Sequence, residues 1–224
     1  MTKQDVRELV WARLQAEEAA RFPGAQGRIP NFKGAEAAAA LLAEQPEWRD
    51  AATVKSNPDS PQLPVRRLAF KGGRDLYMAV PRLREEKPFV LVLGDPTISR
   101  ALEEGVPTAI EEMPYVDLVV CGTVAVNRAG VRIGKGGGYS DLEFALLVET
   151  GLVGERTTIV TTVHPLQLLD EDLPETEHDF RVDLIVTPGE VIRTPGGNRP
   201  PGVLWDHLDP EKIEAIPVLE SRRP

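Results

Sequence analysis

The most constraining part of this sequence is Arg132-Ile133-Gly134-Lys135-Gly136-Gly137-Gly138-Tyr139-Ser140-Asp141, where four of five consecutive residues are glycine. Glycines let a ligand approach the main chain closely and let several N–H groups point toward one place. At the N-terminus of a helix, such a loop is typical of an anion-binding site. Two cations, Arg132 and Lys135, flank the loop, and Asp141 closes it. It matches neither a Walker A loop nor a G-x-G-x-x-G fingerprint, and a glycine-rich turn without a ligand is the alternative.

The segments on both sides of the loop predict an α/β protein. An apolar strand is expected at 117–122 before the loop, and an apolar helix at 142–150 after it. Similar patterns predict further strands at 51–55, 75–81, 89–93, 157–163 and 182–187, and helices at 2–21, 35–43, 65–70 and 98–103. Strands that alternate with helices indicate a mostly parallel sheet with helices on both faces.

Length, charge and cysteine content narrow the class of protein. The chain has 224 residues, of which 42% are hydrophobic, enough to bury one sizeable core. We expect one domain at 1–194 and a proline-rich C-terminal arm at 195–224. The net charge of −9 argues against a chain-wide nucleic-acid surface. The chain has one cysteine, Cys121, no apolar run long enough to span a membrane and no signal peptide. We therefore expect a cytoplasmic protein.

Four charged residues outside the loop are candidates for ligand binding. Lys3 and Arg7 form an i,i+4 pair on the first helix, which is either a solvated basic face or a clamp for phosphate. Asp183 lies in an apolar strand, so its carboxylate needs a scaffold partner or a metal ion. Mg²⁺ commonly binds one or two carboxylates together with phosphate oxygens. Asp141 and Asp183 therefore suggest a magnesium site beside the glycine loop.

The remaining polar candidates are less specific. Ser56 to Gln62 forms a proline-pinned turn after a strand, where open α/β sheets bind ligands. His164, His178 and Asp179 lack the close spacing of zinc ligands, so we do not expect zinc there. Cys121 lies within a predicted strand and is expected to be an inert core residue.

Several motifs together carry a resemblance to a known family. They are Asp117-Leu118-Val119-Val120, Gly130 to Asp141, and Val182-Asp183 before Ile185-Val186-Thr187. In this combination the chain, from Lys3 to about Thr194, resembles the 5-formyltetrahydrofolate cyclo-ligase family. Arg28 to Gly34, Asn57-Pro58-Asp59 and Gly134-Lys135-Gly136 make it most similar to the branch of methenyltetrahydrofolate synthetase domain-containing proteins.

The resemblance implies a three-layer, Rossmann-like α/β/α fold and a reaction that uses ATP and Mg²⁺. That reaction closes the formyl group of 5-formyltetrahydrofolate onto N10 through a phosphorylated formyl oxygen. By position, the nucleotide would contact Lys3, Arg7, Arg132, Gly134, Lys135, Gly136, Gly137, Gly138, Tyr139 and Ser140. Mg²⁺ would bind Asp141 and Asp183. Lys135 and Tyr139 are the expected catalytic residues, and Tyr139, with Asp59 or Gln62, would border the reduced folate.

The chain departs from the family pattern at three positions of the loop region. Asn127 replaces an aspartate, Lys135 an arginine and Ser140 a tyrosine. Lysine keeps the charge but lacks the bidentate fork of arginine. Besides an active cyclo-ligase, two interpretations stay open: a non-catalytic paralogue that binds nucleotide or folate, and another enzyme on this architecture.

Overall fold

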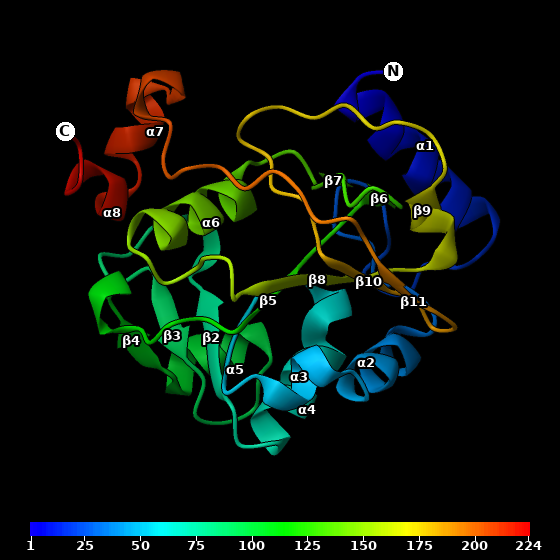
Figure 1. Ribbon diagram of the computed structural model, residues 1–224, viewed down its shortest axis with the longest axis horizontal. Helices are drawn as coiled ribbons and strands as arrows, with labels where there is room; N and C mark the ends of the chain where they lie inside the picture. Colours follow the sequence, from blue (N-terminus) through cyan, green and yellow to red (C-terminus); the bar gives the residue numbers. More distant parts are fainter.

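The computed structural model describes residues 1–224 and contains one large mixed sheet (Figure 1). Its eight strands lie in the order β11-β10-β8-β5-β1-β2-β3-β4. Their bounds in chain order are β1 Thr53–Ser56, β2 Asp75–Ala79, β3 Phe89–Leu91, β4 Val106–Thr108, β5 Leu118–Cys121, β8 Thr158–Thr162, β10 Leu184–Val186 and β11 Val191–Arg193. The five central strands, β10 to β2, pair in parallel, and the strands at both edges are antiparallel.

The order of the strands reverses between β1 and β5. From β1 the chain proceeds outward through β2, β3 and β4, then returns to β5 on the other side of β1 and continues to β8 and β10. Loops that leave two neighbouring parallel strands in opposite directions open a crevice at their carboxyl ends. The sheet thus places a crevice after Ser56 of β1 and Cys121 of β5.

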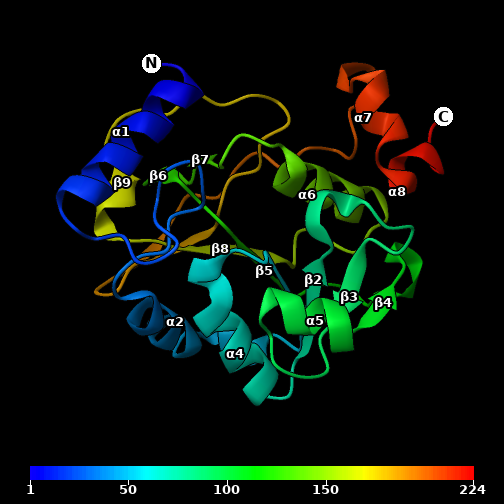
Figure 2. The same cartoon turned by 180° about the vertical axis from the view of Figure 1, so that it is seen from behind.

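Helices cover both faces of the sheet (Figures 1 and 2). On one face lie α2 (Ala35–Ala43), α3 (Pro46–Asp50), α4 (Leu63–Lys71) and α5 (Ile98–Glu104), packed on alternate residues such as Leu118 and Val120. The other face is covered by α6 (Tyr139–Glu149), whose Phe144 and Leu147 share a core with Val119 and Cys121. Because successive residues of a strand point to opposite faces, strands buried on both sides are apolar throughout.

A second, three-stranded sheet joins the N-terminal helix to the loop region. It contains β6 (Ala125–Asn127), β7 (Arg132–Ile133) and β9 (Leu168–Leu169), in the order β7-β6-β9. The helix α1 (Lys3–Ala16) packs on it through Val6, Val10, Trp11 and Leu14. A capping box between Thr2 and Asp5 fixes the start of α1. Lys3 and Arg7, in its first two turns, therefore keep a defined position beside the glycine loop.

The C-terminal segment packs against the α6 side of the core. It contains α7 (Pro210–Glu214) and α8 (Pro217–Glu220), and it buries Val203, Ile213, Ile216, Val218 and Leu219 in the same apolar cluster as α6. The segment expected as a trailing arm at 195–224 thus contributes to this core. Its apolar residues are widely spaced among prolines and charges, so the sequence pattern alone does not show the buried face.

The expected fold class is confirmed, since the sheet is mostly parallel and helices cover both its faces. The first helix ends at Ala16 rather than near residue 21. The sequence pattern does not predict the small sheet, because its strands are only two or three residues long. No helix has both the length and the apolar character needed to cross a lipid bilayer.

Candidate ligand site at the switch point of the sheet

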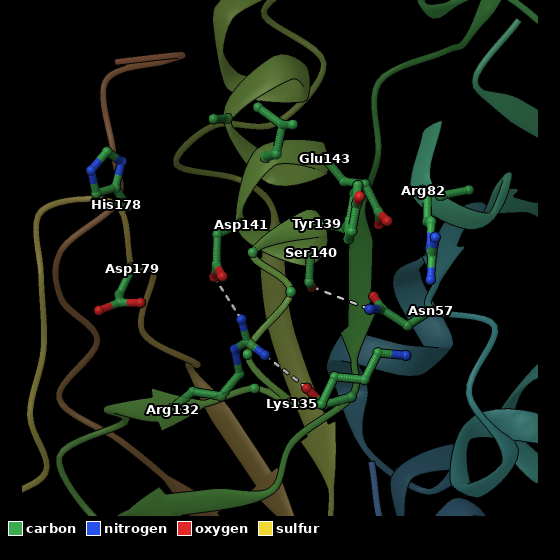
Figure 3. Close-up of a pocket in the computed structure, with 18 of the residues that line it drawn as sticks. Asn57, Arg82, Arg132, Lys135, Tyr139, Ser140, Asp141, Glu143, His178 and Asp179 are labelled. Carbon is green, nitrogen blue, oxygen red and sulfur yellow. Dashed lines mark hydrogen bonds and ion pairs between the residues drawn. The ribbon is translucent and has the colours of Figure 1, made fainter. Parts of the chain in front are cut away.

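A cavity of about 710 Å³ opens at the carboxyl ends of β1 and β5 (Figure 3). The glycine loop and the first turn of α6 form its floor, and α1 contributes Lys3 and Arg7. In Figure 3, His178 and Asp179 lie on one side of the loop, and Asn57 and Arg82 lie on the other. The structure thus brings most of the predicted site residues into one cavity, at the place where the topology predicts a ligand.

The glycine loop presents unpaired N–H groups at the start of α6. Gly136 and Gly138 have φ values of +106° and +69°, and Gly138 caps the helix in a left-handed conformation. None of the backbone N–H groups from Gly136 to Asp141 donates a hydrogen bond within the protein. Unpaired donors that converge at the positive end of a helix dipole favour an anion.

Three cations border the loop, each with a partner in the protein. Lys3 forms an ion pair with Asp179. Arg7 donates from Nε to the carbonyl oxygen of Gly134 at 2.7 Å, and burial lowers the pKa of its guanidinium. Lys135 is half-exposed, with its Nζ 3.1 Å from Oδ1 of Asp59. The cavity therefore holds three cationic groups close to the unpaired N–H groups.

Arg132 is buried beneath the loop and acts as a structural partner of Asp141. Its Nη2 lies 2.6 Å from Oδ1 of Asp141, and its Nη1 donates to the carbonyl oxygen of Gly122 at 2.8 Å. The guanidinium also stacks over the Phe180 ring at 4.5 Å. Burial lowers the pKa of Arg132, but Asp141 and other nearby groups outweigh this effect, and the net pKa is raised. This ion pair fixes the first turn of α6 over the carboxyl end of β5.

A second polar network, which was not predicted, lies at the wall of the cavity and extends into the core. Lys55 of β1 and Glu143 of α6 form an ion pair between sheet and helix, and both are almost fully buried. Lys55 also donates to Oδ1 of Asn57 at 3.1 Å, and Asn57 donates to the Ser140 hydroxyl at 3.2 Å. The network links the turn after β1 to the glycine loop. A lysine in an apolar strand and a glutamate in an apolar helix were the sequence signals for it.

Arg66 of α4 holds the turn after β1 in place. It donates to the carbonyl oxygens of Asn57 at 2.7 Å and Asp59 at 2.9 Å, and to that of Pro96 at 2.9 Å. Burial lowers the pKa of Arg66 to about 10. With its backbone fixed in this way, the turn keeps Asp59 facing Lys135 across the cavity.

Two predicted site residues do not line the cavity. Asp183 lies at the amino-terminal end of β10, where its Oδ2 accepts hydrogen bonds from the Ile159 N–H at 2.8 Å and from Arg199 at 2.9 Å. Burial raises the pKa of its carboxyl group. Gln62 is fully buried, and its side-chain amide has no hydrogen-bond partner. The structure therefore separates Asp183 from Asp141. Of the two candidates in the turn after β1, Asp59 lines the cavity and Gln62 does not.

Several cavity residues had no distinctive sequence signal. Arg82 lines the cavity with a left-handed backbone, φ +61°, which is uncommon and costly for a residue with a side chain. Lys212, from α7, lies 5.2 Å from the centroid of the Tyr139 ring and 3.4 Å from the carbonyl oxygen of Gly137. These residues come from distant parts of the chain, so only the folded structure places them together.

The sheet topology and the cavity define an α/β protein with a glycine-rich loop of unpaired N–H groups at the switch point of its sheet. A sequence model of the 5-formyltetrahydrofolate cyclo-ligase family matches residues 1–188. The chain belongs to this family.

Curated relatives agree with this assignment. The chain is 38% identical over 239 residues to the methenyltetrahydrofolate synthase domain-containing protein of Mus musculus, and 39% identical over 239 residues to that of Homo sapiens. All of this chain is covered, but it spans only 63% and 62% of those proteins. These relatives are longer proteins of which the chain matches one part.

Two solved structures share the fold at low sequence identity. The 5,10-methenyltetrahydrofolate synthetase of Aquifex aeolicus superposes with a TM-score of 0.57 at 21% identity, covering 89% of this chain and 96% of that one. The synthetase of Mycoplasma pneumoniae gives 0.50 at 13% identity, covering 83% and 98%. At this level of identity, the likeness supports the fold alone.

Proposed function

We propose that this protein converts 5-formyltetrahydrofolate to 5,10-methenyltetrahydrofolate, using ATP and Mg²⁺. Family membership supports the class of reaction, because the family uses these two cofactors. The observation that carries the proposal is the row of unpaired N–H groups from Gly136 to Asp141, which faces a cavity with Lys3, Arg7 and Lys135 at its border. A polyphosphate is the kind of ligand that needs many donors and several cations in one place.

In this proposal the glycine loop binds the phosphates, and the cations balance their charge. The formyl oxygen attacks the γ-phosphorus, and ADP leaves. N10 then forms a bond to the formyl carbon and gives up its proton to solvent, and the bond between this carbon and the phosphorylated oxygen breaks, releasing phosphate. Because both steps develop charge on phosphoryl oxygens, positioned donors and cations are the main contribution that the chain can make.

Asp141 is the one predicted metal ligand that suits Mg²⁺ at this place. Its Oδ1 is held by Arg132, while no hydrogen bond in the protein engages its Oδ2. One carboxylate oxygen, completed by phosphate oxygens and water, is a common set of Mg²⁺ ligands. Bound there, the ion would neutralise charge on the phosphates. Asp183 is too involved with Arg199 and the β8 backbone to be part of this set.

Lys135 and Asp59 would act at the boundary between nucleotide and folate. Their ion pair holds the Lys135 ammonium across the cavity from the turn after β1. We propose that Lys135 turns from Asp59 to the phosphate when the nucleotide binds. That movement would free the Asp59 carboxylate to accept hydrogen bonds from a reduced pterin, next to the ring of Tyr139.

One observation favours the alternative of a binding protein without turnover. Of the four cations at the loop, all except Arg7 already have a carboxylate partner. Lys3 pairs with Asp179, Arg132 with Asp141, and Lys135 with Asp59. A nucleotide would compete with at least two of these internal acids. The departures at Lys135 and Ser140 fall in the same loop, so binding could persist while catalysis is lost.

Turnover of 5-formyltetrahydrofolate separates the two proposals. Purified protein is mixed with ATP, Mg²⁺ and 5-formyltetrahydrofolate, and formation of the methenyl product is followed by its absorbance. Reactions without ATP and without Mg²⁺ are the controls, and ATP binding is measured separately by calorimetry. If ATP binds and no product forms, the cyclo-ligase proposal is wrong, and the result supports the alternative of a binding protein without turnover.

A further inference from the structure

Glu177, His178 and His207 form a cluster of potential metal ligands at the edge of the cavity. One ligand atom from each residue lies within 4.8 Å of the other two. His178 and His207 both line the cavity. The spacing of residues along the chain does not reveal the cluster, because the two histidines are 29 positions apart and lie on different segments.

The distances within the cluster match those between ligands of one metal ion. His207 Nδ1 lies 3.1 Å from His178 Nε2 and 3.2 Å from Glu177 Oε1. Two nitrogen ligands of tetrahedral Zn²⁺, each at about 2.0–2.1 Å from the ion, are about 3.3 Å apart. A small movement of the side chains would therefore place a single ion within bonding distance of both rings and the carboxylate.

The two segments that carry the histidines are held by local hydrogen bonds. In the turn that contains His178, the Asp179 carboxylate accepts hydrogen bonds from the Thr176 N–H at 2.6 Å and from the Thr176 hydroxyl at 3.0 Å, and it also pairs with Lys3. His207 ends a short 3-10 helix, with its N–H bonded to the Leu204 carbonyl oxygen at 3.0 Å. Ligands on fixed backbones lose little conformational entropy when they bind an ion.

We propose that Glu177, His178 and His207 bind a transition-metal dication of the zinc class. Imidazole nitrogen suits Zn²⁺ and Co²⁺, whereas Mg²⁺ prefers oxygen ligands, so this site is chemically distinct from a magnesium site at Asp141. Two histidines and one glutamate leave a coordination position for water or for a ligand in the cavity. The proposal does not depend on cyclo-ligase activity.

The ion would tie the C-terminal segment to the loop before β10. His207 lies beyond residues 1–188, which the family sequence model matches, while Glu177 and His178 lie within them. The same C-terminal segment carries Lys212, which contacts the Tyr139 ring and the glycine loop. A metal at this site would therefore stabilise one wall of the cavity.

The test is a titration of Co²⁺ into the 224-residue protein without a histidine tag, since a tag would bind the metal itself. We expect one equivalent to bind with visible absorption bands typical of nitrogen ligands, and Zn²⁺ to displace it. A large excess of Mg²⁺ should leave the bands unchanged. In a parallel thermal melt, Zn²⁺ should raise the Tm, because an ion that binds only the folded state stabilises it.

Variants assign the ligands. His178→Ala and His207→Ala should each weaken Co²⁺ binding by at least about tenfold, and Glu177→Gln should weaken it less, because an amide oxygen remains. The chain has three histidines, and His164→Ala is the matched control, since His164 Nδ1 accepts from the Leu166 N–H and lies outside the cluster. The proposal is overturned if the wild type binds no Co²⁺, if His207→Ala binds it as tightly as the wild type, or if His164→Ala causes the same loss. Because Glu177 and His207 are exposed, we expect their variants to fold, and a circular-dichroism spectrum checks this.

Discussion

Replacing Gly136 with alanine tests whether the glycine loop binds phosphate. Gly136 has φ +106°, which residues with a side chain rarely adopt. The atoms nearest to a Cβ atom added there would be those of the Arg7 guanidinium, the first at 3.4 Å, so the substitution strains the backbone without a severe clash. The loop is exposed and can relax to another conformation, which turns its N–H groups away from the phosphates.

The magnitude follows from the cost of that backbone conformation. An alanine in a sparsely populated region costs about 1–3 kcal/mol. If nucleotide binding must restore the conformation, this cost is subtracted from the binding free energy. The affinity for Mg²⁺–ATP should then fall by about fivefold to about 150-fold, at about 1.4 kcal/mol for each factor of ten. Isothermal titration calorimetry measures the change directly.

Gly151→Ala is the matched control for this experiment. Gly151 follows α6 at its other end and has φ +72°, and a Cβ atom added there would have no other atom within 4 Å. It carries a similar backbone strain outside the cavity, so its variant should lose stability without losing affinity for ATP. The reasoning is refuted if Gly136→Ala, confirmed as folded, binds Mg²⁺–ATP within about twofold of the wild type.

Three further predictions concern the core and the chemistry. Lys55→Met should lower the free energy of unfolding by about 3–5 kcal/mol in urea, because it leaves the buried Glu143 carboxylate without its partner, and adding Glu143→Leu should restore most of the loss. A double variant no more stable than Lys55→Met would contradict this account. Lys135→Ala should lower kcat more than it weakens ATP binding, since the charge that it meets grows in the transition state; equal losses in the two assays would argue against that role. Burial raises the pKa of the Cys121 thiol, so a thiol reagent should label it in urea but not in the native protein, and rapid native labelling would show that the core is open.

The local hydrophobic pattern of the chain determined the architecture, and its glycines determined the position of the glycine loop. Short apolar runs such as 157–163, rich in β-branched residues, are buried on both faces, and this pattern is visible without any tertiary information. The glycines from Gly134 to Gly138, between a strand and a helix, marked this loop as a candidate for anion binding, because their conformational requirement is local. Asp141 and Ser140 lie in the cavity for the same reason, since they follow the loop directly in the chain.

Only the tertiary structure decided which charges meet. Arg132, which is expected to bind phosphate, lines the cavity and pairs beneath the loop with Asp141. Asp183 lies at the other end of its strand and pairs with Arg199. A charged side chain in an apolar segment shows that a partner is needed, but the partner depends on how distant segments pack. The contact of His178 with His207 arises in the same way, because the C-terminal segment folds back over α6 and places His207 Nδ1 3.1 Å from His178 Nε2. Hydrophobic periodicity is a local property of the chain, whereas electrostatic partners depend on contacts between residues far apart in sequence.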